Sequence, residues 1–208
     1  MLALLPEALE VREDEAFDQH REALAALHRR RDQLVDMRAV ERGRIASEPD
    51  QDARRSLESH IDWLSAAIEE LEVKIRSILA KPPFARRAKL LATAKGVGTV
   101  TVTTILALLP ELGRCSAKAI AALAGLAPIN RDSGTLRGQR HIAGGRRRVR
   151  QALYMAALAA IRTHEPFKQH YLAIKARSGH AKVAIVAVAR KLLVTLNAMI
   201  KSDQPFRA

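Results

Sequence analysis

The apolar positions between residues 57 and 78 alternate between spacings of four and three residues. They are Leu57, Ile61, Leu64, Ile68, Leu71, Ile75 and Ile78. This spacing is typical of a coiled-coil seam, a narrow apolar stripe that packs against another helix. Residues 16–40 are also helical in pattern, but Arg31 interrupts their apolar stripe and predicts a weaker helix. Between the two segments, Pro49 and its polar neighbours predict a turn.

Two arrangements satisfy this pattern. The segments form an antiparallel hairpin, or they are a pair of helices that await a partner. A third interpretation, two surface helices on a globular core, is less compatible with a narrow seam that has charged flanks. We expect the chain to form homo-oligomers through the coiled coil.

The long helix ends at Lys81-Pro82-Pro83, because neither proline can donate the helix hydrogen bond. A second helical region begins after these residues. We therefore predict a hairpin linker and dimerisation region at 1–81 and a compact helical domain at 84–208. Residues 100–105 are rich in β-branched side chains, as in a strand, but they follow a Gly-x-Gly turn and merge into an apolar run, which favours helix. The predicted fold is all-α, with helices at 86–94, 99–109, 116–124, 146–163, 166–177 and 180–200.

Charge divides the chain at the same boundary. Residues 1–80 contain 12 Lys and Arg against 18 Asp and Glu, a net charge of −6, whereas residues 81–208 contain 23 against 4, a net charge of +19. An acidic part joined to a basic part indicates one region for protein contacts and another for polyanions.

Composition narrows the class of partner. Cys115 is the single cysteine, which excludes an intramolecular disulfide and a cysteine-based zinc site. No uninterrupted apolar run approaches the roughly 18 residues of a membrane span, so we expect a cytoplasmic, nucleoid-associated protein with no membrane partner. Aromatic residues make up 3% of the chain, which argues against base-stacking platforms and leaves contacts to the nucleic-acid backbone and grooves.

A Gly-Val-Gly turn at residues 96–98 separates two predicted helices and is similar to a helix-hairpin-helix motif. Glycines there permit left-handed or crowded backbone and expose N–H groups beside a helix amino terminus, where a phosphate can bind. Lys95, Gly96, Gly98 and Thr99 are the candidate phosphate contacts. The alternative is a turn that serves helix packing alone.

Arginines accumulate between Gly134 and His164, where the sequence has no acidic side chain. Glycines at 134, 138, 144 and 145 predict a flexible loop that moulds onto a phosphate backbone, rather than an ordinary solvated charge run. The candidate backbone contacts in and around this loop are Arg131, Arg137, Arg140, His141, Arg146, Arg147, Arg148 and Arg150.

Ser133 lies at the entrance to this loop, in an Asp-Ser-Gly triplet. Guanidinium groups around a hydroxyl stabilise a phosphorane-like transition state and lower the cost of ionising the hydroxyl. From the triplet alone, a plain turn is the commoner interpretation. The seven histidines form no ligand cluster by spacing, and His141 is the one placed to contact phosphate or assist Ser133.

Several motifs occur here in a fixed order. They are Gly96-Val97-Gly98, Leu109-Pro110-Glu111-Leu112-Gly113, Leu123-Ala124-Gly125-Leu126-Ala127-Pro128, Ser133-Gly134, Gly144-Gly145-Arg146, Val149-Arg150-Gln151-Ala152-Leu153-Tyr154 and Ala189-Arg190-Lys191-Leu192-Leu193. Together they resemble the carboxy-terminal transposase domain of the one-ten family of insertion sequences, recombinases guided by a bridge RNA. The resemblance covers about residues 84–200, and the upstream coiled coil resembles the family's linker.

The resemblance implies a function that the residues alone leave open. It implies that Ser133 attacks DNA as a nucleophile, that DNA and a guide RNA are partners, and that the chain is a transposase domain. It also implies a resolvase-like acidic domain, absent from this sequence, that binds divalent metal such as Mg²⁺. We therefore expect this chain to hold no cofactor and to be inactive alone. The alternatives are a non-catalytic DNA-binding and dimerisation protein, such as a transposase remnant or regulator, and a structural helix-hairpin-helix adaptor.

Overall fold

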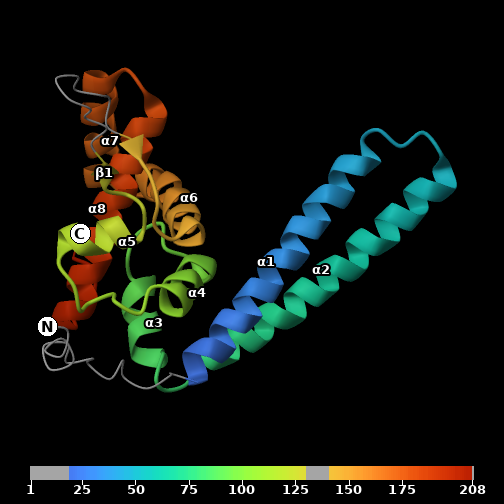
Figure 1. Cartoon of the computed structure of the whole chain (residues 1–208), viewed down its shortest axis with the longest axis horizontal. Coiled ribbons are helices and arrows are strands. Elements are labelled where there is room, and N and C mark those ends of the chain that lie inside the picture. The colour runs from blue at the N-terminus through green and yellow to red at the C-terminus, as the bar shows by residue number, and fades with distance from the viewer. Residues whose placement is uncertain (1–18, 130–140, 208) are drawn as a thin grey trace, which may run out of the picture.

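The computed structural model describes residues 19–129 and 141–207, and over these residues the fold is all-α with one short ribbon of two strands. A long helical hairpin projects from a body of shorter helices (Figure 1). The elements are α1 (Gln19–Ile45), α2 (Gln51–Leu79), α3 (Ala85–Ala92), α4 (Thr99–Leu108), α5 (Ala117–Leu123), β1 (Pro128–Ile129), β2 (His141–Ile142), α6 (Arg147–Thr163), α7 (Glu165–Ser178) and α8 (Ala181–Ser202).

The first two helices form an antiparallel hairpin, so the coiled-coil seam packs within the chain. Leu64 and Ile68 of α2 are buried against Leu34 of α1 and form a small apolar cluster in the hairpin. At the turn, the Asp50 carboxylate caps α2 by accepting hydrogen bonds from the amides of Asp52 and Ala53. The seam predicted at 57–78 is therefore used, at least in part, to hold α1 and α2 together.

Arg31, which interrupts the apolar stripe of α1, contacts the other helix of the hairpin. Its guanidinium reaches across the hairpin, with Nε 3.0 Å and Nη2 2.8 Å from Oε1 of Glu72. Both side chains are partly buried, and α1 runs unbroken for 27 residues. The interruption in the stripe is thus a charge-assisted contact between the two helices.

Helix α8 is the centre of the body, and α3, α5, α6 and α7 pack around it. Its inward face is apolar, from Ala184 through Leu192, Leu193 and Leu196. Among the described residues it is the one helix long and apolar enough to cross a membrane, but half of its most apolar window is buried by the other helices. That burial is what a core helix of a globular body requires.

Helix α4 confirms the prediction of helix for the β-branched segment and overturns the strand alternative. Its residues from Thr101 to Ala107 are all buried. The hydroxyl of Thr103 donates to the carbonyl of Thr99 (2.8 Å), and that of Thr104 donates to the carbonyl of Val100 (2.7 Å). These bonds back onto the helix satisfy the two hydroxyls without disturbing their apolar surroundings.

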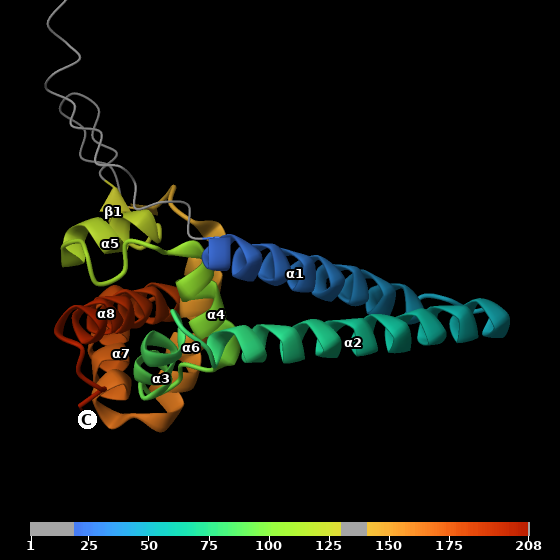
Figure 2. The same cartoon turned by 90° about the horizontal axis from the view of Figure 1, so that it is seen from below.

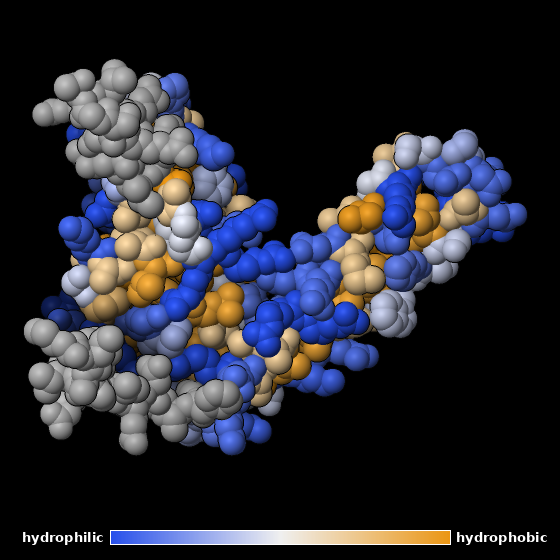
Figure 3. All heavy atoms as spheres, in the orientation of Figure 1, coloured by the Kyte–Doolittle hydropathy of each residue, from blue (hydrophilic) through white to orange (hydrophobic). Residues whose placement is uncertain are grey.

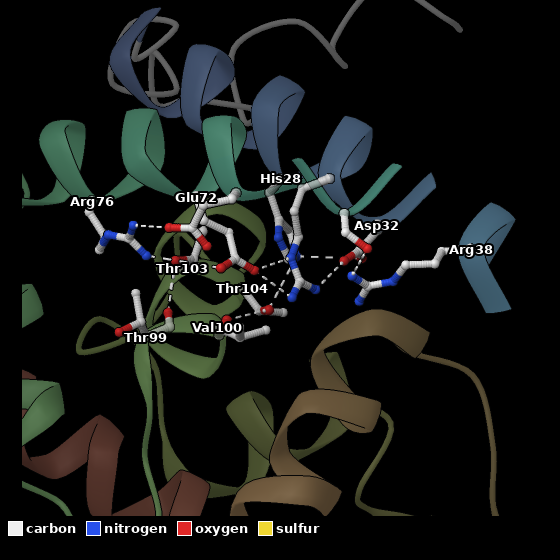
Figure 4. A network of polar contacts seen from close by, with 12 residues as sticks. His28, Asp32, Arg38, Glu72, Arg76, Thr99, Val100, Thr103 and Thr104 are labelled. Carbon is white, nitrogen blue, oxygen red and sulfur yellow. Dashed lines mark hydrogen bonds and ion pairs between the residues drawn. The ribbon is translucent and has the colours of Figure 1, made fainter. Parts of the chain in front are cut away.

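A buried histidine joins the hairpin to the body (Figure 4). The side chain of His28 in α1 is 2% exposed, and its Nε2 lies 3.1 Å from the Thr104 hydroxyl oxygen. Since that hydroxyl donates its own proton to Val100, Nε2 must carry the hydrogen of the contact. Burial lowers the pKa of His28, so the neutral ring is the favoured form at this junction.

Candidate nucleic-acid interface

The ribbon of β1 and β2 holds together the two ends of the segment that contains Ser133. Pro128 pairs with Ile142, and Ile129 pairs with His141, in antiparallel register. Residues 130–140 lie outside the described residues, and with them the candidates Arg131, Ser133, Arg137 and Arg140. The ribbon and α5 lie on one side of α8 (Figure 2). Whatever residues 130–140 do, they act from this fixed base.

Two glycines make the base of the ribbon rigid where the sequence suggested flexibility. Gly125 and Gly145 both have left-handed φ angles, +67° and +62°. A Cβ on Gly145 would lie 2.2 Å from the amide nitrogen of Gly125, so the two backbones are in direct contact. The amide of Arg146 adds a hydrogen bond of 2.8 Å to the carbonyl of Leu123. Gly145 therefore packs against Gly125, a contact that the sequence did not indicate.

Arg150 fastens the same junction. Its Nη1 donates to the carbonyl of Gly144 at 2.7 Å and lies 3.5 Å from that of Gly125. The side chain is partly buried and spans the two backbone segments that enter and leave the ribbon. Arg150 was predicted to contact phosphate, and in the structure its guanidinium links the backbone at Gly144 to the backbone at Gly125.

Arg146 and Arg148 both form ion pairs with carboxylates of this chain. Nη1 and Nη2 of Arg146 each lie 2.6 Å from a different carboxylate oxygen of Glu111, which lowers the pKa of Glu111 and raises that of Arg146. Nη2 of Arg148 lies 2.7 Å from the carboxylate of Asp36, and its Nε is 3.5 Å from that of Asp32. This second pair ties α6 to α1, and its hydrogen bond raises the pKa of Arg148.

Arg147 differs from its neighbours because it is exposed and makes no hydrogen bond or ion pair with any described residue. It lies in the first turn of α6, beside the ribbon. Lys182 and Arg190, on α8, are also on this side of the body and line a groove under the ribbon. Sequence reasoning did not include these two among the main candidates, although their positions on one helix with Val183 and Val186 would have placed them together.

In the Gly-Val-Gly turn, Gly96 is the position at which the backbone conformation and the close packing require glycine. Gly96 has a φ of +82°, and a Cβ there would lie 2.5 Å from the carbonyl oxygen of Ala156 and 2.5 Å from the amide nitrogen of Ala160. The turn is therefore pressed against α6. Gly98 has an ordinary φ of −93° and caps α4 without a side-chain bond, and Lys95 and Thr99 are exposed. A phosphate site remains a prediction for the exposed side of this turn.

The described residues contain no group of three or more His, Cys, Asp or Glu side chains that could hold a metal ion. His164 and His180 occupy the N-cap positions of α7 and α8, and neither makes a side-chain capping hydrogen bond. The His164 ring also packs against Phe167 and Phe206, with centroids 5.0 and 5.3 Å away.

Comparison with known proteins identifies relatives of the basic domain. Residues 88–172 match the family model described as transposase IS116/IS110/IS902. The chain is 30% identical over 154 residues to the pilin gene-inverting protein of Moraxella lacunata, an alignment that covers 72% of this chain and 48% of that protein. It is 27% identical to a protein of insertion element IS110 from Streptomyces coelicolor (70% and 36% covered) and 31% identical to one of IS116 from Streptomyces clavuligerus (58% and 31%). The chain spans about half the length or less of these relatives.

Proposed function

We propose that this chain, whose residues 88–172 match the transposase IS116/IS110/IS902 family model, is the strand-transfer part of a DNA recombinase and that Ser133 is its nucleophile. The basic body binds DNA in the cytoplasm, at the nucleoid. A guide RNA is the second nucleic-acid partner, as the resemblance in the sequence implies. The hairpin is a linker whose exposed surface serves self-association.

The observation that supports this proposal is the rigid base under the segment from 130 to 140. A nucleophile must be held at a fixed position relative to the bound strand, and small displacements cost large factors in rate. The β1–β2 pairing, the contact of Gly125 with Gly145 and the hydrogen bonds of Arg150 together fix both ends of this segment. A segment that served only as a surface turn would not need three independent restraints.

The chemistry is a transesterification at phosphorus. The Ser133 oxygen forms a bond to the phosphorus of a DNA phosphodiester, the bond to one deoxyribose oxygen breaks, and the leaving strand takes a proton. The serine proton passes to a general base, and neighbouring guanidinium groups stabilise the charge on the non-bridging oxygens. The product is a serine–DNA phosphodiester, which conserves the bond energy needed to rejoin a strand.

The described residues do not fit a divalent metal, because no three carboxylate or imidazole groups converge. The general base and the metal are proposed to belong to the acidic domain that the resemblance in the sequence implies. The proposal accordingly predicts that the chain alone binds DNA without cleaving it.

A non-catalytic DNA-binding protein is the second candidate function. It is favoured by the ion pairs of Arg146 with Glu111 and of Arg148 with Asp36, which give two of the predicted phosphate contacts a counter-charge within the protein. In that case Ser133 is part of a turn and contributes no chemistry.

A trapping experiment separates these two functions. The chain is mixed with the acidic domain of a related recombinase, Mg²⁺, guide RNA and a labelled DNA duplex, and adducts that survive denaturant are resolved on a gel. The nucleophile proposal expects an adduct with the native chain and none with Ser133→Ala, while both bind duplex with similar affinity. Adducts that persist in Ser133→Ala would remove Ser133 from the mechanism, and their absence from both proteins would favour the non-catalytic function.

A further inference from the structure

A groove of about 520 Å³ lies between the ribbon and the first half of α8. Its apolar walls come from both sides, with Pro128 and Ile142 on the ribbon and Val183, Val186 and Ala187 on α8. Val183 is 50% exposed and Ile142 is 37% exposed, so the groove presents large apolar side chains to solvent. Binding of an apolar ligand over these side chains would be favoured, because it would remove their apolar surface from water.

The rim of the groove is cationic. Lys182, Arg190 and His180 line it, and its described lining contains no carboxylate. His180 caps α8 without a side-chain hydrogen bond, so the positive amino-terminal end of a 22-residue helix adds to the same field. Apolar walls with cations at the rim suit a nucleotide of a nucleic-acid strand, whose base is a flat, weakly polar ring and whose sugar is flanked by phosphates.

We propose that this groove holds one unstacked nucleotide of the DNA, with its base against Val183, Val186 and Ala187 and its flanking phosphates near Lys182 and Arg190. The inference rests on the proposed DNA-binding function and adds a site to it. Pro128 and Ile142 belong to the ribbon whose two strands flank, in the sequence, the segment that contains Ser133. A base held in the groove would leave the stack and open the strand locally.

The first test compares affinities of the full chain for two DNA duplexes of about 30 base pairs, one fully paired and one with a single bulged nucleotide. A bulge removes the cost of unpairing, so we expect binding about fivefold tighter or more than to the paired duplex. Ala187→Leu fills the groove and should reduce this preference to less than about twofold. Ala176→Leu, the same substitution at an exposed position of α7, should keep the preference.

The outcomes separate this site from the general function. Equal affinity of the native chain for both duplexes overturns the groove proposal alone, and so does a preference that survives Ala187→Leu. Failure to bind either duplex overturns the proposed function and this inference with it. The two results are distinguishable in one titration.

A second measurement needs no variant, and so it applies even if Ala187→Leu misfolds. The bulged base is replaced by 2-aminopurine, whose fluorescence is quenched by stacking. The described residues that line the groove include no Phe, Tyr or Trp, so entry of the base should raise its emission about twofold or more on protein binding. The same probe in the paired part of the duplex should not change. An unchanged or quenched bulge signal would contradict the proposal.

Discussion

The guanidinium of Arg146 and the carboxylate of Glu111 meet in a two-point contact, with both nitrogen–oxygen distances at 2.6 Å. Glu111 is on the connection between α4 and α5, and Arg146 immediately precedes α6. The pair therefore joins the start of α6, next to the ribbon in sequence, to the connection between α4 and α5. It also neutralises an arginine that the sequence alone assigns to nucleic acid.

The contact predicts a loss of stability in acid. Its hydrogen bonds hold the pKa of Glu111 below the ordinary value of 4.5. The stabilisation is thus fully present above pH 4.5 and is lost as the pH falls through the lower folded-state pKa. Because both side chains are about a third exposed, we expect a contribution of roughly 0.5–1 kcal/mol. Urea unfolding at a series of pH values below 7 should show that Glu111→Gln is less stable than the native chain at pH 7 and that the difference shrinks as the Glu111 carboxylate becomes protonated. A difference that stays the same across the series would contradict this assignment.

The two adjacent glycines at 144 and 145 provide a matched pair of substitutions. Both have left-handed φ angles, but a Cβ on Gly144 meets nothing within 4 Å, whereas one on Gly145 collides with the backbone of Gly125. Gly144→Ala should therefore lower the free energy of unfolding only by the cost of holding alanine in a left-handed conformation, about 1–2 kcal/mol. Gly145→Ala should cost about 1–3 kcal/mol more through steric overlap. Urea midpoints measure the difference, and equal midpoints would show that the contact between Gly145 and Gly125 is not maintained in solution.

Arg147 should carry more of the salt dependence of DNA binding than Arg146. Each phosphate contact adds about 0.9 to the slope of log affinity against log salt on duplex DNA, so Arg147→Gln should lower the slope by about that amount. Arg146→Gln should lower it less, since Arg146 is already paired with Glu111. Titrations at four or five salt concentrations give both slopes. An equal reduction in the two variants would mean that Glu111 releases Arg146 when DNA binds.

Local patterns predicted the helices of this protein because their causes are local. The spacing of apolar residues places α2 and α8, and the prolines at 82 and 83 mark the end of the hairpin. The secondary structure of the run from Val100 to Ile105 was harder to predict, since its β-branched side chains favour a strand. It forms a helix because burial on several sides and hydrogen bonds back to the helix outweigh a weak intrinsic preference.

The roles of individual arginines and glycines were not predictable in the same way. Arg31 pairs with Glu72, which is 41 positions away, and Arg148 pairs with Asp36, which is 112 positions away. Neither partner is visible in the local sequence, so an arginine run looks like a phosphate surface even where the fold has supplied the counter-charge. Gly145 was likewise interpreted as a source of flexibility because its contact with Gly125 exists only in the folded chain.

The last prediction concerns self-association through the hairpin. Leu64 is fully buried against α1, so Leu64→Asp would test the folding of the hairpin rather than an interface between copies. Association must instead use exposed apolar side chains, and Figure 3 shows such side chains on the outer half of the hairpin. The exposed large hydrophobic side chains of α1 and α2 include Met37 (43% exposed), Val40 (54%) and Trp63 (58%).

We therefore expect Trp63→Glu to give monomers at micromolar concentration in sedimentation while helix content stays unchanged. Leu172→Glu, at an exposed leucine of α7, is the matched control and should leave the association state of the native chain unaltered. An oligomer that tolerates Trp63→Glu would place the interface outside the hairpin. A native chain that is already monomeric at this concentration would show that the coiled-coil seam serves only to join α1 to α2, because the one seam that the sequence provides is then satisfied within a single copy.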